Sequence, residues 1–222
     1  MKITIKRILC PTDMSPESDE ALRYAIALAR AYEAKLFICH SVDSSSLPCE
    51  SRTWEINQMI ESLVSNPTPL APSPTLEWES VLVAGEPAEV ITREAAKREV
   101  DLIVMRTRQR PYAAALLGST AEAVCRTAHC PVLVTPSREW AGFPTGEVSL
   151  NRLLVAYDFS EDSELALAWG LSLSQEYQAE LHLLHILPRE DKPVGPGRDW
   201  RKSAGDRRFQ KAALLLQTAV PA

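Results

Sequence analysis

Short apolar runs alternate along the chain with segments in which apolar residues recur at helical spacing. Most of the runs lack the polar alternation of a strand with one face in water, which is typical of strands buried on both faces of a parallel sheet. Strands are predicted at residues 8–10, 36–39, 76–83, 101–105 and 131–134. Helices are predicted after Ser15 and over residues 88–98 and 119–127, with a short helical stretch at 54–63 inside a Ser- and Pro-rich loop.

The pattern of the first strand, helix and second strand occurs twice. Residues 7–42 align without a gap with residues 152–187 at a constant offset of 145, and twelve of the thirty-six positions are identical. Two copies at a spacing of this size indicate a tandem duplication, because a solenoid repeat would be far shorter.

Each copy reads as strand, Asp, Ser, helix and strand. Asp13 or Asp158 ends the first strand, and Ser15 or Ser160 stands where the N-cap of a helix belongs. Pro16 follows Ser15 as an N1 residue should. A strand, helix and strand of this length form a βαβ unit, which nearly always crosses over with right-handed geometry.

The alternation of strands and helices predicts an α/β fold, a doubly wound parallel five-stranded sheet with helices on both faces, followed by a partial second copy. Ligands of such sheets bind at the carboxyl ends of the strands, where the strand order reverses. Asp13, Val42, Gly85 and Arg106 all lie at predicted carboxyl ends.

Three segments resemble the universal stress protein family in order and in register: ILCPTDMSPESDEALRYAIALA, VAGEPAEVITREAAKREVDLIVM and LLGSTAEAVCRTAHCPVLV. The resemblance covers residues 3–136 and, for the second copy, 150–187. It implies an adenine-nucleotide α-hydrolase-like fold. The expected organisation is a complete domain at 1–138, a linker at 139–149, a partial second domain at 150–188, and a basic Pro/Gly-rich tail at 189–222 with a short helix at 206–216.

The resemblance also implies a ligand site. Nucleotide-binding members carry an Asp near the adenosine, a main-chain contact to the base after the second strand, and a phosphate loop of the form G-x2-G-x9-G-[ST]. In this sequence these are Asp13, the neighbourhood of Val42, and a loop that ends at Gly118-Ser119. The candidate nucleotide-binding residues are therefore Asp13, Val42, Gly85, Arg106, Arg108, Gly118, Ser119 and Thr120.

The loop departs from the family pattern, because Arg106 and Gln109 stand at the two leading glycine positions. A Cβ there would fill space that a phosphate needs, whereas Arg106, Arg108 and Arg110 offer cations that could hold phosphate oxygens. The first hypothesis is a non-catalytic stress-response protein that acts through dimerisation or partner binding. The alternative is a module for ATP or AMP that uses Asp13, Gly118, Ser119 and the arginines.

Several side chains allow two interpretations. Ser119 and Glu122 form a capping box or leave the helix start open to an anion. Asp13 meets a ribose or Mg²⁺, or else hydrogen-bonds backbone amides at the helix start. His40 and His185 are expected to pack or hydrogen-bond rather than to catalyse. The strand at Val132–Val134 is the natural edge for pairing with a second chain or with the second copy.

Composition narrows the function further. The net charge of −5 favours neither a nucleic-acid nor a membrane partner, and no apolar run approaches the roughly 20 residues of a membrane span. The N-terminus has no signal-peptide core, so a cytoplasmic location is expected. The five cysteines predict free, buried thiols and no metal site. No nucleophile–base pair, HExxH or Walker A sequence occurs, which argues against an enzyme.

Overall fold

The computed structural model describes residues 3–15, 18–42, 76–107, 118–135, 150–187 and 207–219, with residues 54–55, 57–58 and 61–62 in helical conformation. The chain forms two compact units, the first comprising residues 4–148 and the second residues 1–3 and 149–222. Each unit is described separately below. None of the helices in the described part of the chain combines the length and the apolar character that a membrane span requires.

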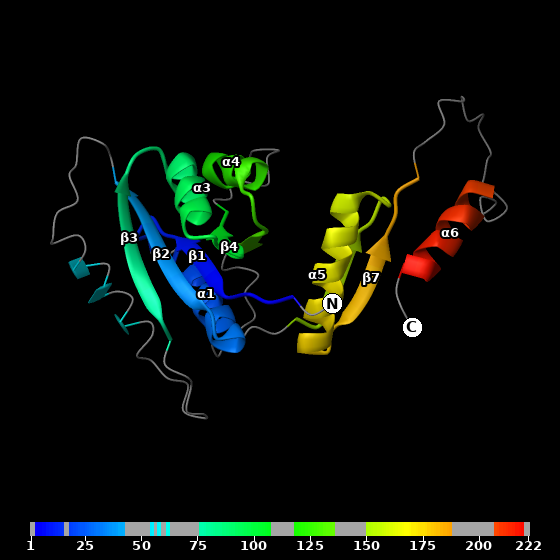
Figure 1. Ribbon diagram of the computed structural model, residues 1–222, viewed down its shortest axis with the longest axis horizontal. Helices are drawn as coiled ribbons and strands as arrows, with labels where there is room; N and C mark the ends of the chain where they lie inside the picture. Colours follow the sequence, from blue (N-terminus) through cyan, green and yellow to red (C-terminus); the bar gives the residue numbers. More distant parts are fainter. Residues whose placement is uncertain are drawn as a thin grey trace. The chain divides into compact units, whose positions relative to one another are not determined.

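The first unit is built on a five-stranded parallel sheet, which confirms the predicted fold class. Its strands lie in the order β3-β2-β1-β4-β5 (Figure 1). The bounds are β1 (Arg7–Pro11), β2 (Lys35–Val42), β3 (Trp78–Ala84), β4 (Leu102–Arg106) and β5 (Val132–Thr135). The order reverses between β1 and β4, so the crevice of this sheet opens at their carboxyl ends.

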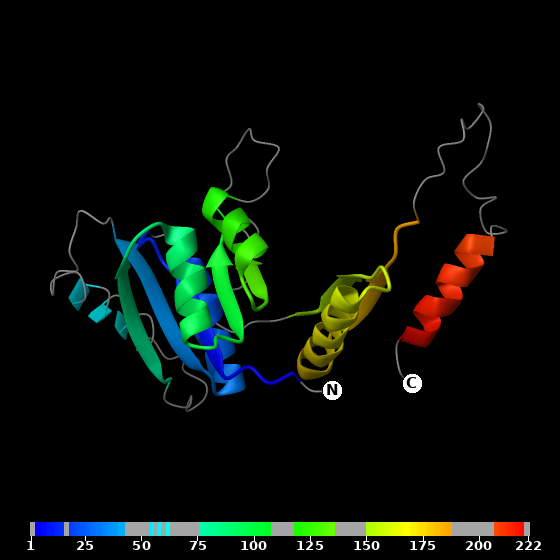
Figure 2. The same ribbon diagram turned by 45° about the horizontal axis from the view of Figure 1, so that its top comes forward.

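Helices cover both faces of this sheet. The helix α1 (Ser18–Tyr32) packs against β1 and β4 on one face, and α3 (Pro87–Lys97) and α4 (Ser119–Thr127) lie together on the other (Figure 2). Leu9, Phe37 and Cys39 point from β1 and β2 into the core under α3 and α4, and each is at most 6% exposed. Burial on both faces explains why these strands read as continuous apolar runs in the sequence.

The start of α3 shows how the sequence sets a helix boundary. Gly85 has a φ of +143°, a backbone conformation that favours glycine, and a Cβ there would lie 3.1 Å from Val90 Cγ2. Glu86 is the N-cap, and its carboxylate accepts a hydrogen bond from Glu89 N at 3.1 Å. Pro87 follows as the first helical residue, where its missing N–H costs nothing.

The second unit contains the repeated strand, helix and strand. Its elements are β6 (Arg152–Ala156), α5 (Glu161–Tyr177), β7 (Glu180–Leu184) and α6 (Arg207–Ala219). The strands β6 and β7 are parallel, with Arg152 opposite Glu180. The helix α6 lies where the sequence predicts one at residues 206–216. In the same unit, Ile3 N donates to Ser172 Oγ at 2.9 Å.

The repeat extends to the backbone conformation. Met14 and Phe159 occupy equivalent positions and both have positive φ, 61° and 68°. Glu33 and Gln178, which end the equivalent helices, both have a φ of 52°. The βαβ prediction is therefore confirmed for both copies, including residues that sequence patterns do not single out.

The packing of α5 on β6 requires a glycine. A Cβ at Gly170 would lie 2.6 Å from Val155 Cγ2 and 3.1 Å from Leu181 Cδ1. The equivalent pair in the first unit is Ala25 and Cys10, both fully buried. The helix residue is thus smaller where the strand residue is larger, as close packing demands.

We expect Gly170→Ala to destabilise the second unit by about 1 kcal/mol, because the overpacking penalty of about 1–3 kcal/mol exceeds the helix-propensity gain of about 1 kcal/mol. Amide hydrogen exchange in α5 and β6 measures this change. The double variant Gly170→Ala/Val155→Cys carries the pair of the first unit and should recover stability. Equal destabilisation by the single and double variants would contradict the explanation.

Candidate functional site

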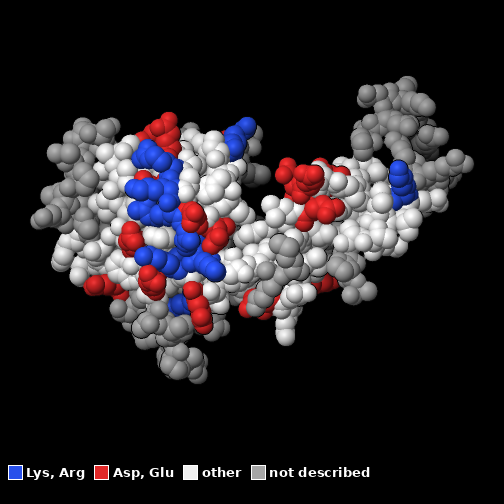
Figure 3. All heavy atoms as spheres, viewed as in Figure 1, with Lys and Arg blue, Asp and Glu red and all other residues white. Residues whose placement is uncertain are grey.

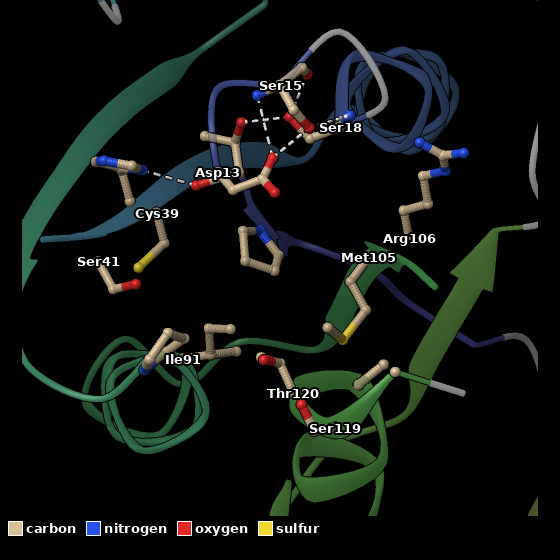
Figure 4. A pocket seen from close by; sticks show the side chains of 16 residues that line it. Asp13, Ser15, Ser18, Cys39, Ser41, Ile91, Met105, Arg106, Ser119 and Thr120 are labelled. Carbon is tan, nitrogen blue, oxygen red and sulfur yellow. Dashed lines mark hydrogen bonds between the residues drawn. The ribbon is translucent and has the colours of Figure 1, made fainter. Parts of the chain in front are cut away.

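A pocket of about 410 Å³ opens at the carboxyl ends of β1, β2 and β4, opposite the amino end of α4 (Figure 4). This volume falls in the range of small-molecule sites. The lining residues are Pro11, Thr12, Asp13, Ser15, Ser18, Cys39, His40, Ser41, Pro87, Ile91, Met105, Arg106, Gly118, Ser119, Thr120 and Ala121.

Five of the predicted site residues line this pocket: Asp13, Arg106, Gly118, Ser119 and Thr120. Val42 and Gly85 do not line it; instead Gly85 N donates to the Val42 carbonyl at 3.0 Å, which joins β2 to the turn before α3. Arg108, together with Gln109 and Arg110, lies outside the described residues.

Asp13 organises the turn between β1 and α1. Its Oδ1 accepts hydrogen bonds from Ser15 N at 3.1 Å and from Ser15 Oγ at 2.5 Å. Ser15 Oγ in turn accepts from Ser18 N at 3.3 Å, and Thr12 Oγ1 lies 2.8 Å from Ser18 Oγ. The backbone-amide interpretation of Asp13 is therefore confirmed, and the same carboxylate stands in the pocket wall.

His40 bridges the ends of two strands. Its Nδ1 lies 2.8 Å from the carbonyl oxygen of Thr12, so Nδ1 is the donor. His185 makes the same contact to the carbonyl of Tyr157, also at 2.8 Å. Both histidines hydrogen-bond as predicted.

The capping box predicted at Ser119 and Glu122 is wrong. The N-cap of α4 is Gly118, which has no side chain to bond the helix start, and Ser119 is already helical. The Glu122 carboxylate pairs with Arg126 at 2.7 Å, one turn further on, instead of reaching back. The helix begins one residue earlier than the capping-box pattern requires, so its N-cap position is held by a residue without a capping side chain.

Arg106 ends β4 at the pocket. Its Nε is buried and has no hydrogen-bond partner in the part of the chain that the structure describes. Figure 4 shows its side chain directed toward the turn between β1 and α1, on the side of Ser15 and Ser18. A buried guanidinium nitrogen without a partner is costly, and a bound anion would satisfy it.

One wall of the pocket is apolar. Cys39 of β2 contributes a thiol, Ile91 of α3 an aliphatic side chain, and Met105 of β4 a thioether. Burial raises the pKa of the Cys39 thiol to about 12, with Glu94 adding to the shift, so this cysteine is a neutral wall residue rather than a nucleophile. Sequence reasoning did not assign these residues to the site, although strand-end positions pointed to the neighbourhood.

The cysteine predictions hold in part. Cys10 and Cys39 are buried and free, whereas Cys125 is free but exposed on α4 and Cys130 is half-buried. The prediction of a buried thiol is wrong for Cys125, because helix α4 turns this side chain to solvent. Cys49 lies outside the described residues. Within the described ranges, no three His, Cys, Asp or Glu side chains gather in a way that could hold a metal ion.

Known proteins match both copies. The sequence model of the "Universal stress protein family" matches residues 4–136 and 149–220. The chain belongs to the universal stress protein family. The second match runs to residue 220 and so includes α6, beyond the segment ending at 187 that carries the resemblance.

Similar proteins include universal stress proteins that this chain matches over different shares of their length. One from Methanocaldococcus jannaschii is 36% identical over 145 residues, 60% of this chain and 85% of that protein. One from Mycobacterium tuberculosis is 27% identical over 206 residues, 87% of this chain and 67% of its own length. A solved structure titled as a putative universal stress protein from Pseudomonas aeruginosa covers 96% of this chain and 69% of its own, with 16% identity and a TM-score of 0.66, which supports the fold.

The second universal stress protein segment does not repeat the polar pocket wall. Tyr157 replaces Thr12, and its ring packs edge-on against Phe159 at 5.1 Å. Phe159 in turn lies 4.7 Å from the ring of His185. The turn is kept, since Asp158 Oδ1 accepts from Ser160 N at 3.0 Å and from Ser160 Oγ at 2.5 Å, but aromatic rings stand beside it.

Charge elsewhere on the first unit is mixed. Figure 3 shows a band of Lys and Arg interleaved with Asp and Glu. At the amino ends of the strands, Lys35 pairs with Glu77 at 3.1 Å and with Glu79 at 3.2 Å. Arg7 pairs with Glu99 at 2.7 Å. Acidic side chains therefore interrupt the basic band on the face shown.

We expect the Asp158 carboxyl to titrate below its ordinary value of 3.8, because hydrogen bonds from the Ser160 hydroxyl and amide lower its pKa. A lowered pKa means that the stabilisation is present above the unfolded-state pKa and is lost as the pH falls through the folded-state pKa. Carboxyl ¹³C NMR titration measures the value, and Ser160→Ala should raise it. An unchanged pKa in that variant would contradict the assigned cause.

Proposed function

We propose that the chain is a non-catalytic universal stress protein whose first unit binds a small phosphate-bearing ligand of the adenine-nucleotide class. The pocket at the carboxyl ends of β1 and β4 supports this proposal, because a cationic side chain and the amino end of a helix both line its partly apolar cavity. Stress response is the role that family membership suggests.

The observation that carries the proposal is that Arg106 and the amino end of α4 line one pocket. Among the described residues, the buried Arg106 Nε has no hydrogen-bond partner, and the N-cap of α4, Gly118, makes no side-chain cap hydrogen bond. Both line the same pocket. A helix start favours an anion through its amide groups and dipole, and a guanidinium adds a charge-assisted hydrogen bond.

The remaining walls suit the other parts of a nucleotide. Asp13 offers carboxylate oxygen to ribose hydroxyls, and the polar groups of Ser41 and His40 stand near the end of β2. Ile91 and Met105 provide apolar surface for a planar base. This arrangement, with few polar groups in an apolar cavity, is typical of small-molecule sites.

The sequence alone favours a protein with a degenerate ATP loop that acts through dimerisation or partner binding. The Arg106 geometry shifts the preference to binding, since the residue that replaces the first loop glycine lines the pocket with a buried Nε that has no partner among the described residues. In this proposal the arginine substitutes for backbone amides that a glycine loop would present.

A non-catalytic role fits the side chains of the pocket wall. The raised pKa of Cys39 keeps its thiol neutral, and the Asp13 carboxylate is committed to Ser15. His40 Nδ1 is committed to a backbone carbonyl. No described lining residue forms an activated nucleophile with a neighbouring base.

Titration calorimetry with ATP and AMP, with and without Mg²⁺, tests the ligand. We expect a Kd below roughly 10 μM, the range of working nucleotide sites. Arg106→Ala should weaken binding at least about 10-fold, because a charge-assisted contact worth about 1.5–3 kcal/mol is lost. Arg126→Ala is the matched control, since Arg126 is an exposed arginine on α4 that pairs with Glu122.

Two outcomes would contradict this proposal. Absence of binding by either nucleotide at millimolar concentration would favour the role in partner binding. Tighter binding by the variant Arg106→Gly/Gln109→Gly would indicate that the arginine blocks a degenerate loop rather than replacing it.

The second candidate is dimerisation through β5, favoured by its place at the sheet edge. Leu133 at the centre of this strand is 37% exposed. An uncovered edge strand offers unpaired backbone groups to another strand, and the second copy is an alternative partner to a second chain.

We expect Leu133→Arg to weaken such a dimer at least about 10-fold, because a charge would be placed in the apolar part of the interface. Sedimentation equilibrium of the full chain measures the association constant. Leu165→Arg, at another exposed leucine, is the control. An unchanged constant in Leu133→Arg would exclude β5 as the dimer edge.

A further inference from the structure

The two-stranded sheet of the second unit has one covered and one bare face. Leu153, Val155, Leu181 and Leu183 alternate toward α5 and are buried or half-buried. The residues between them point the other way. Leu154 is 67% exposed and Leu184 is 43% exposed, and Ile186, just after β7, is 77% exposed.

The internal repeat identifies the bare face as a core face. In the first unit, Leu9 stands where Leu154 does and is fully buried, and Cys39 stands where Leu184 does and is 1% exposed. There α3 and α4 supply the cover, through Ile91, Ala121 and Val124 in the same cluster. In the second unit the same face leaves Leu154 and Leu184 exposed.

We propose that the bare face of β6 and β7 is a self-association surface, on which a second copy of this chain packs its own β6–β7 face about a two-fold axis parallel to the strands. Two sheets packed face to face at about 10 Å bury apolar residues from both. The interface is isologous, so each contact occurs twice.

The arrangement of residues across the face favours a second copy as the occupant. A two-fold axis along the strands places β6 of one copy over β7 of the other, and the strand register then sets which side chains meet. Arg152 faces Glu180 of the other copy, a pair of opposite charges. The small Ala156 faces the large Leu184, and Leu154 faces His182.

The opposite orientation lacks this complementarity. With the strands antiparallel, a two-fold axis across the strands would place each strand over its own copy, so Arg152 would face Ala156 and Glu180 would face Leu184. Both charges would lose water without gaining a partner. The charged end and the apolar end of the face therefore select the parallel arrangement.

The area sets the expected strength. Two strands of five residues form a patch below the size of standard interfaces, so self-association should be weak, with a Kd on the order of 10–100 μM. A weak dimer of this kind forms or dissolves over a moderate range of protein concentration, and it leaves β5 of the first unit uninvolved.

Sedimentation velocity of the full chain from 1 to 300 μM tests the proposal. We expect reversible dimerisation that Leu154→Arg weakens at least about 10-fold, because one arginine from each copy would be placed in the small apolar interface. Leu165→Arg, on the exposed side of α5, should leave it unchanged. Running the series also in the Leu133→Arg background separates this surface from the β5 edge.

A charge exchange provides the second measurement. Arg152→Glu alone should weaken association about 5-fold or more, because two carboxylates would face each other, and Arg152→Glu/Glu180→Arg should restore it. A chain that stays monomeric to 300 μM would overturn the proposal, as it would mean that another part of the chain or another protein covers the face. Association that survives Leu154→Arg, or an exchange that fails to restore it, would overturn it equally.

Discussion

A parallel sheet must be covered on both faces, and this constraint governs both units of the protein. The first unit meets it with α1 on one side and with α3 and α4 on the other, so Leu9 and Phe37 are buried. The second unit meets it on one side only, since α5 covers Val155 and leaves Leu154 in solvent.

The same constraint places the site. Because α1 and α3 leave the sheet on opposite faces, the strand order reverses between β1 and β4 and opens a crevice at their carboxyl ends. The polar turn of Asp13 and Ser15 forms one wall, and the amino end of α4 forms another. In the second copy the turn is retained, whereas Tyr157 and Phe159 fill the adjacent space with rings. The turn is therefore present in both copies, although the space beside it is open only in the first.

Ligand binding and self-association occupy different parts of the molecule. The ligand proposal depends on the Arg106 guanidinium and the uncapped start of α4, both in the first unit. The self-association proposal depends on the alternation of β6 and β7 in the second unit. A universal stress protein with both would carry a ligand site in the first copy of the repeated unit and a weak self-association surface in the second copy.

The sequence by itself determined the elements, their order, the repeat and the neighbourhood of the site, because apolar runs, helix caps and strand ends are local patterns. It placed Asp13 and Ser119 in the site but misjudged the α4 cap, since Gly118 and Ser119 differ by one residue in a pattern that tolerates either start. Only the tertiary structure decided that Cys39 and Met105 line the pocket, that Val42 and Gly85 bond to each other, and that Arg106 Nε lacks a partner. Those facts depend on contacts between residues that are far apart in the sequence, and a local sequence pattern does not specify such contacts.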